Sequence, residues 1–337
     1  MDKEAMKKRI KGTLIGCAYG DAMGMPTEMM ALEDIKEIYP YGIHEFHPSN
    51  EKDFLGRKLK AGEITDDTYN TMMIAQMIID QKGKINAEKY IAHLRGWITE
   101  NKEKFQYTAG PSTIRALQAI ENGVPIGKAG IHGTTNGAAM KISPIGIISS
   151  YHHMEELVDH VCQICLPTHN TGIAIAGAAA VAACVSYGIQ GGTDYHKLWE
   201  IAMEAAEIGA KRGNQRVSIS LKKRIAAVKK LTETAEKSIV IEELQTFYGT
   251  GAATEETIPA VLALISLAEG NPIIAGSMAA TVGGDTDTIG AIACAICGSM
   301  HPDFPERIVT QLEEVNHIGF GQISKGLLSY VDDTGVF

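Results

Sequence analysis

Residues 283–298 read GGDTDTIGAIACAICG, in which two glycines and two aspartates lead directly into an apolar run of isoleucine, alanine and cysteine. A second run of this kind, AIAGAAAVAAC, occupies residues 174–184. Alanine is the best helix former, and its small side chain allows neighbouring helices to approach closely. Both runs therefore predict helices that lie in the core of the protein.

Helical spacing of apolar residues continues through most of the chain, and the alternation typical of strands is scarce. We predict an all-α, compact, single-domain helical bundle that spans 1–337, with a core from about 10 to 325. The predicted helices are 4–19, 66–81, 87–99, 112–121, 154–165, 171–187, 196–210, 215–230, 257–269, 272–281, 288–299 and 304–315. Binding chemistry usually lies in loops, and the predicted loops are 20–28, 40–64, 132–146, 167–170, 247–254 and 282–288.

The composition places the chain among globular proteins. Of its 337 residues, 45% are hydrophobic and 21% are charged, whereas disordered chains have few hydrophobic residues. The net charge of −9 argues against a nucleic-acid partner, since such proteins usually carry a basic face. The charged N-terminus lacks the apolar core of a signal peptide, and the apolar run 173–187 is short for a membrane span. We expect a cytoplasmic protein with no membrane partner.

Four of the six cysteines form two C-x-x-C pairs, at 162–165 and 294–297. Both pairs lie inside apolar helical runs, VCQIC and ACAIC, without the glycine or proline of a zinc knuckle. Residues three apart share one face of a helix, where a small apolar side chain packs well. We therefore interpret the cysteines as reduced core residues.

Two segments combine threonine hydroxyls with paired aspartates, ITDDT at 64–68 and GGDTDT at 283–288. Thr65 is the predicted N-cap of the next helix. The helix dipole favours a negative charge in the first turn, which explains one acid there. Two adjacent carboxylates repel each other unless a positive charge lies between them. Four carboxylates and two hydroxyls would suit two hard divalent cations, Mg²⁺ or Mn²⁺. The candidate metal ligands are Thr65, Asp66, Asp67, Asp285, Asp287 and Thr288.

Further loops hold candidate functional residues. In GDAMGMPTE, Asp21 is predicted to cap a turn, and Glu28 is either a solvated residue or an acid that projects into the metal site. The GTTNGAA segment at 133–139 offers glycines, hydroxyls and backbone N–H groups, which cradle phosphates or form an ordinary turn. His169, in the string PTHN, is a helix cap, a core residue or a site residue.

Together these segments resemble the ADP-ribosylglycohydrolase family. The matching strings are GDAMGMPTE, ITDDT, TNGAAMKISPIG, PTHN, TIPAVLAL and GGDTDTIGAIACAICG, in the family's order over about residues 10–300. The combination looks most like bacterial members that carry NGAAM and PTH together. The resemblance implies a compact orthogonal helical bundle of the family's type with two Mg²⁺ ions, or Mn²⁺ in their place.

The resemblance also implies roles for individual residues. The two threonines and four aspartates named above match the family's metal ligands. Glu28 matches an acid near the metals, which implies a general base or a residue that positions water. The positions that match substrate-binding loops are Gly133, Thr134, Thr135, Asn136, Gly137, His169 and Gly284.

The activity implied by the resemblance is hydrolysis at C1 of ribose in an ADP-ribosylated substrate, through an oxocarbenium-like transition state. The leaving group is open between an arginine or serine side chain of a protein and a free base, as in a nucleoside N-ribohydrolase. A non-catalytic ADP-ribose-binding protein is the third alternative, and the chain is expected to be a monomer or small homo-oligomer. Segment 101–113 is expected to contribute to specificity. Aromatic residues that would stack on a base or belong to the core are Phe105, Tyr107, Phe247 and Tyr248.

Overall fold

Two apolar helices, α1 (Lys3–Gly24) and α16 (Thr286–Met300), pack antiparallel against each other at the centre of the fold. Their backbones are so close that a Cβ atom on Gly16 would lie 2.0 Å from the Cys294 carbonyl oxygen. Residues four apart lie on one face of a helix. That face of α1 is glycine throughout, at Gly12, Gly16, Gly20 and Gly24.

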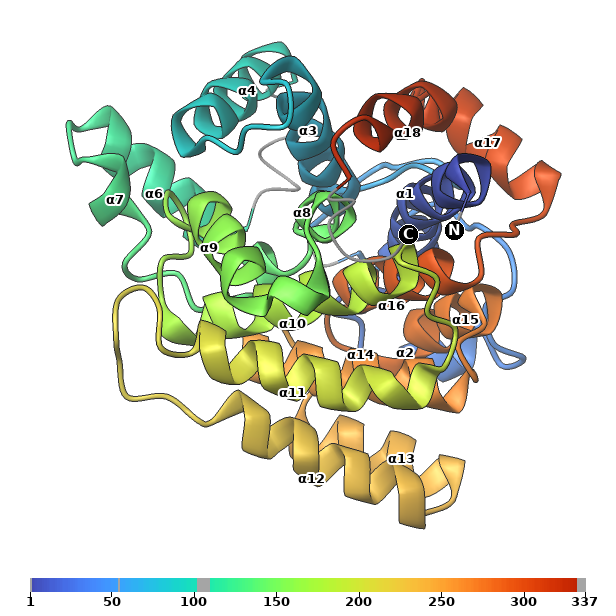
Figure 1. The fold of residues 1–337 in the computed structure, drawn as a ribbon. Helices are drawn as coiled ribbons and strands as arrows, with labels where there is room; N and C mark the ends of the chain where they lie inside the picture. The colour runs from blue at the N-terminus through green and yellow to red at the C-terminus, as the bar shows by residue number, and fades with distance from the viewer. Residues whose placement is uncertain (1, 54, 102–109, 332–337) are drawn as a thin grey trace.

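The computed structural model describes residues 2–53, 55–101 and 110–331 (Figure 1). These residues form helices and turns, and none of them belongs to a β-strand. The other α-helices are α2 (Leu32–Ile38), α3 (Asp66–Asp80), α4 (Ala87–Glu100), α6 (Pro111–Glu121), α7 (Ile126–Ala129), α8 (Ser143–Ile148), α9 (Met154–Cys165), α10 (Gly172–Ile189), α11 (Leu198–Gly209), α12 (Leu221–Thr234), α13 (Lys237–Glu243), α14 (Thr254–Leu267), α15 (Pro272–Val282), α17 (Glu306–Asn316) and α18 (Phe320–Leu328). Short 3₁₀ turns cover Met25–Thr27, Asn136–Ala138, Tyr151–His153 and Tyr195–Lys197, and a π-helical turn covers Leu244–Tyr248.

The alanine-rich helix α10 crosses the middle of the molecule, where it contacts α8, α9, α11, α14 and α16 (Figure 1). All 18 of its residues are buried, which confirms the prediction of a core helix. Its length and composition would also suit a membrane span, but the whole apolar window lies inside the protein. The cysteines fit the same core: five are buried, Cys162 is half-buried, and all are free thiols.

The all-α prediction is confirmed, but several boundaries were wrong. The predicted loop 20–28 is helical as far as Gly24, because Gly20 and Gly24 continue the contact with α16. Helix α12 begins at Leu221 rather than near 215, since the Ser220 hydroxyl accepts from the Lys223 N–H and caps it. Short helices were also missed, among them α8, which begins inside the predicted loop 132–146.

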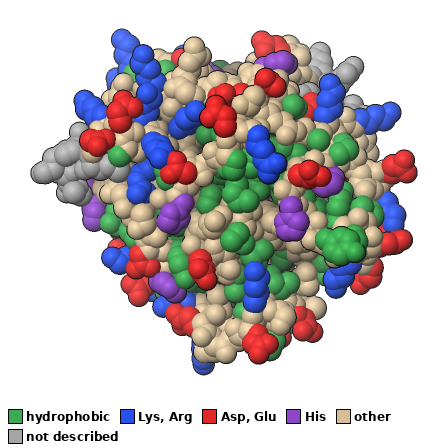
Figure 2. All heavy atoms as spheres, turned by 90° about the vertical axis from the view of Figure 1, so that its right-hand side faces the viewer, with side chains coloured by type: hydrophobic (Ala, Val, Ile, Leu, Met, Phe, Trp, Pro, Cys, Tyr) green, Lys and Arg blue, Asp and Glu red, His purple; other side chains and the backbone are tan. Residues whose placement is uncertain are grey.

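The face of the molecule shown in Figure 2 carries side chains of both charges around a central group of hydrophobic ones. Exposed large hydrophobic residues occur elsewhere along the chain as well, and Tyr41 and Val217 are among the most exposed. Interspersed charges of both signs are typical of the surface of a folded domain. This face therefore has a mixed rather than a uniformly basic or acidic character.

The glycine face of α1 gives a first prediction. In Gly16→Ala the new methyl group would meet the Cys294 backbone, which cannot move as a side-chain end would. We expect the free energy of unfolding to fall by about 2 kcal/mol or more, as for overpacked cores. Urea denaturation measures this change.

The matched control is Gly96→Ala in α4, where no atom of the described residues lies within 4 Å of the added methyl group. Alanine there should stabilise the helix by up to about 1 kcal/mol. Equal responses at Gly16 and Gly96 would contradict the role of the α1–α16 contact.

Candidate active site

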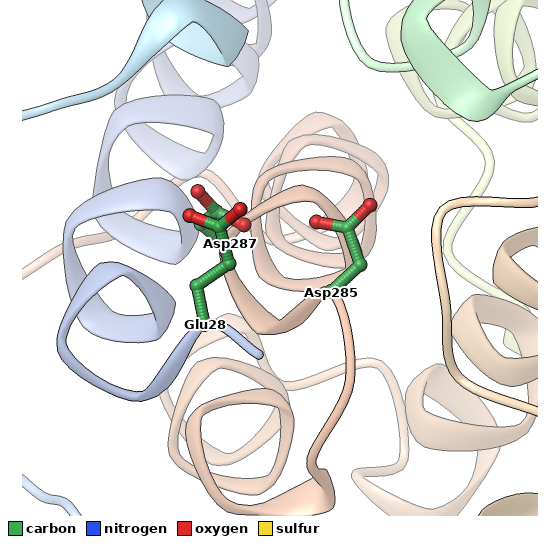
Figure 3. A group of neighbouring side chains, drawn as sticks. All are labelled: Glu28, Asp285 and Asp287. Carbon is green, nitrogen blue, oxygen red and sulfur yellow. The ribbon is translucent and has the colours of Figure 1, made fainter. Parts of the chain in front are cut away.

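The antiparallel contact brings the end of α1 to the beginning of α16, and a cavity of about 210 Å³ lies there. Glu28 follows the 3₁₀ turn after α1, Asp285 is the N-cap residue of α16, and Asp287 lies in its first turn. One carboxylate oxygen from each lies within 4.8 Å of the others (Figure 3). Acids from two segments distant in sequence thus form one acidic cluster that could hold a metal ion.

The beginning of α3 supplies further acids to the same cavity, which Asp66 and Asp67 line. Asp21 of α1 holds this helix end in place: its carboxylate accepts from the Thr65 N–H at 3.0 Å and the Thr68 hydroxyl at 2.5 Å. Thr65 is the N-cap residue of α3, as predicted, but its hydroxyl donates to Asp67 Oδ2 and does not accept from a backbone N–H of the first turn. Thr65 supports Asp67 without lining the cavity itself.

The carboxyl groups of the cavity are buried close to one another, which makes their ionised forms unfavourable and raises their pKa values. Burial, followed by the charge of Asp287, raises the pKa of Glu28 well above its usual range. Burial, Glu28 and Asp21 raise the pKa of Asp66 to about 8. Asp67 Oδ1 is buried with no hydrogen-bond partner among the described residues. An orphaned carboxylate oxygen beside other acids fits the donor set of a hard divalent cation.

Arg57 is a part of the site that sequence reasoning missed. Its buried guanidinium donates from Nη1 to Glu28 Oε2 at 2.5 Å and from Nε to Asp53 Oδ2 at 3.0 Å. Nη1 also lies 3.8 Å from Asp287 Oδ2. Within the predicted loop 40–64 this arginine was one charge among many, so no local signal identified it. It neutralises part of the acidic cluster on the side of Glu28.

Another part of the cavity wall comes from the segment before α8 and from the residues just before α10. Asn136 donates to Asp285 Oδ2 at 2.7 Å and to the Thr257 hydroxyl at 2.9 Å, so its amide orientation is fixed. Of the predicted substrate-binding residues, Thr135, Asn136, Gly137 and His169 line the cavity. The structure therefore brings these four residues into the same cavity as the acidic cluster.

The remaining three predicted substrate-binding residues do not line this cavity. A Cβ on Gly133 would lie 2.2 Å from the Thr168 carbonyl oxygen, and the Thr134 carbonyl accepts from the Thr254 hydroxyl at 2.8 Å. Gly284 has a φ of +76° and accepts from the Met29 N–H at 2.8 Å. The contacts of Gly133, Thr134 and Gly284 hold the loops of the site in place. Their direct role in substrate binding was predicted from their positions in the motifs, and the geometry of the cavity does not support it.

The segment 101–113 reaches the cavity through its described part. Gly110, Pro111, Ser112 and Thr113 line it, while Phe105 and Tyr107 fall outside the described residues. Phe247 and Tyr248 do not line the cavity, and Phe247 is 73% exposed, so the core alternative is wrong for it. Lining residues that carried no signal in the sequence are Met29, Leu55, Met140 and Ala252.

Carboxylates from several helix ends thus meet in one cavity of a helical protein, and they form a donor set that could hold a hard divalent cation. The family model for ADP-ribosylglycohydrolase matches residues 2–333. YegU of Escherichia coli is 31% identical over 330 residues, which are 96% of this chain and 97% of YegU. The chain therefore belongs to the ADP-ribosylglycohydrolase family, and membership implies glycosyl hydrolase activity.

More distant proteins agree with this assignment. ADP-ribosylhydrolase ARH3 of Bos taurus is 24% identical, over 87% of this chain and 85% of ARH3. A solved structure of an ADP-ribosylglycohydrolase-related protein complex matches with a TM-score of 0.66, over 97% of this chain and 99% of that chain. At 19% identity, this second likeness shows that the fold is shared.

Arg57 gives the second prediction. Arg57→Ala would leave Glu28 and Asp53 without the cation that they share, and removing one partner of a buried ion pair typically costs about 3–5 kcal/mol. Urea denaturation of metal-free protein should show a loss of this size. Lys52→Ala, which removes an exposed pair with Asp34, is the control and should change stability little. A loss below about 1 kcal/mol for Arg57→Ala would contradict the interpretation.

The carboxyl groups give a third prediction, for protein stripped of divalent ions. Between pH 6.5 and 8 the folded protein keeps protons, notably on Asp66 with a pKa of about 8, that the unfolded chain has already lost. The unfolded state then binds fewer protons, so stability falls as pH rises. Burial lowers the pKa values of His169 and Lys141, and these oppose the trend mainly below 6.5 and above about 8.

We therefore expect Tm to decrease from pH 6.5 to pH 8, and Mg²⁺ to raise Tm more at pH 8 than at pH 6.5. Differential scanning fluorimetry with and without Mg²⁺ measures both effects. A Tm that rises over this interval, or an equal effect of Mg²⁺ at both values, would show that these acids are not the dominant titrating groups.

Proposed function

We propose that the chain is an ADP-ribosyl glycohydrolase that cleaves the bond at ribose C1 of an ADP-ribosylated substrate and uses two Mg²⁺ ions. The observation that supports this most directly is the convergence of Glu28, Asp285 and Asp287 with Asp66 and Asp67 on one cavity. This convergence occurs in a chain of the ADP-ribosylglycohydrolase family, and the relative ARH3 is named as an ADP-ribosylhydrolase.

The donor set of the cavity fits the proposed metal ions. Asp66 and Asp67 from α3, and Asp285, Asp287 and Thr288 from α16, line it, and Thr65 supports Asp67 through its hydroxyl. Such ligands hold Mg²⁺ or Mn²⁺, and these cations would polarise oxygen ligands and favour a nucleophilic water at neutral pH.

Glu28 is the proposed general base. Arg57 donates to one carboxylate oxygen of Glu28 and so holds this side chain at the cavity, where the carboxylate would position a water and accept its proton. Burial raises the pKa of Glu28 above its usual range, so its carboxylate form is a stronger base than that of an exposed glutamate. Asn136, which is fixed by Asp285 and Thr257, gives the substrate a rigid wall on the opposite side.

A second candidate follows from the size of the cavity. Its volume of about 210 Å³ is smaller than the roughly 300 Å³ or more of typical pockets for drug-sized ligands. A nucleoside or another small ribosyl compound would need less space than a complete ADP-ribosyl group. An N-ribohydrolase with the same acids is therefore the alternative.

The cytoplasmic location and the oligomeric state stay predictions from the sequence.

The experiment that tests the proposal offers ADP-ribosyl-arginine, ADP-ribosyl-serine and free nucleosides to the protein with Mg²⁺. Release of ADP-ribose is the expected result. Release of ribose from nucleosides alone would favour the alternative, and no hydrolysis of any substrate by metal-loaded protein would favour a binding role.

Glu28→Gln is the fourth prediction. It removes the proposed base while keeping the shape of the side chain, so kcat should fall by about 10²-fold or more. The control is Glu33→Gln in α2, an exposed acid outside the cavity, which should leave kcat unchanged. Unchanged turnover in Glu28→Gln, with Mg²⁺ binding intact by calorimetry, would show that Glu28 is not the base.

A further inference from the structure

A lysine lies fully buried next to the site without an ion-pair partner among the described residues. Lys141 has no exposed surface, and its ammonium lies 5.2 Å from the centroid of the Tyr90 ring. Burial lowers its pKa to about 8, so the ammonium form still prevails at neutral pH. Its Nζ donates a hydrogen bond to the Thr168 hydroxyl, at 3.3 Å. The nearby charged or ionisable groups are Asp66 and Cys165.

With Lys141 in its ammonium form this bond runs from the lysine to Thr168, since an ammonium group only donates. The Thr168 oxygen therefore accepts from Lys141, and it also lies 2.8 Å from His169 Nδ1. If it accepted from the histidine as well, its own hydrogen would have no acceptor among the described residues. A buried, unpaired hydroxyl is costly, so Thr168 donates to His169 Nδ1.

His169 is the next member of this chain of hydrogen bonds. Burial and the charge of Lys141 lower the pKa of its imidazole well below 6.5, so the ring is neutral and carries one N–H. Because Nδ1 accepts from Thr168, the hydrogen is on Nε2, which lies 3.0 Å from the Thr135 hydroxyl. Thr135 in turn donates to Ser112 Oγ at 3.2 Å.

The chain of hydrogen bonds ends at the cavity. Ser112 lines it, and its hydroxyl hydrogen has no acceptor among the described residues. Every bond upstream points the same way, from the buried ammonium towards Ser112. The free end of the chain is therefore a donor and faces the place where the substrate would lie.

We propose that Lys141 is a positioning residue that sets the direction of the chain Thr168–His169–Thr135–Ser112, so that Ser112 offers a hydrogen-bond donor to the substrate. The cavity wall at Ser112 would then favour a substrate that places an acceptor oxygen next to the Ser112 hydroxyl, such as a carbonyl, ring or phosphoryl oxygen. A substrate with an N–H at that position would be disfavoured. The identity of the substrate rests on the proposed function, whereas the direction of the chain is a property of the protein alone.

The test reads the tautomer of His169 by ¹⁵N NMR of protein labelled at histidine, with its signals assigned by comparison with His169→Gln. The expected result for the native protein is a neutral ring with hydrogen on Nε2. Lys141→Met and Thr168→Val should both give a mixture of tautomers or the Nδ1–H form. Thr168→Ser, which keeps the hydroxyl, should restore the native tautomer.

Hydrogen on Nδ1 in the native protein would overturn the proposal, as would an unchanged Nε2–H form in Lys141→Met or in Thr168→Val. Thermal unfolding checks that each variant is folded. If Lys141→Met does not fold, the comparison of Thr168→Val with Thr168→Ser still decides the question. None of these measurements needs a substrate, so they remain valid if the proposed function fails.

Ser112→Ala tests the donor itself once a hydrolysed substrate is known. Loss of one hydrogen bond should raise KM about five- to tenfold while kcat changes less than twofold. Ser277→Ala, which removes an exposed hydroxyl bonded to His44 outside the cavity, is the control. An unchanged KM in Ser112→Ala would overturn the donor role of Ser112 even if the His169 tautomer is as expected.

Discussion

The structure depends on the direct backbone contact between α1 and α16. Four glycines on one face of α1 allow carbonyl groups of α16 to approach to distances that any Cβ would forbid. Because the helices are antiparallel, the contact aligns the end of one with the beginning of the other. Glu28 is thereby placed beside Asp285 and Asp287, at a precision that loops alone would not provide.

Helix α1 also organises the second half of the acidic site. Asp21 accepts hydrogen bonds from the first turn of α3 and so fixes the positions of Asp66 and Asp67. Two buried cations, Arg57 and Lys141, lie on different sides of the carboxylates and offset only part of their charge. Burial raises the pKa values of Glu28 and Asp66, so in the metal-free protein protons offset part of the remaining charge, and a divalent cation would take their place.

The sequence predicts the fold class and the acids of the site well, because both depend on local patterns. Helical spacing and alanine-rich runs identify α10 and α16, and the Asp-Thr strings identify the acids at two helix beginnings. Asp21 was predicted to cap a turn, but that it caps the distant helix α3 could not be predicted, and neither could the role of Arg57, because each depends on a partner distant in the chain. The end of α1 was misjudged because glycine usually ends a helix, whereas Gly20 and Gly24 here serve packing.

The α1–α16 contact has a consequence for synthesis of the protein. The glycine face of α1 leaves the ribosome before its partner, α16, which follows more than 250 residues later, at 286–300. Until then the glycine face of α1 lacks the helix that packs against it, and the apolar helix α10 lacks its neighbour α16. Assembly of the acidic cluster is therefore a late event in folding, and a nascent chain released before α16 would contain half of the site without the helix that completes it.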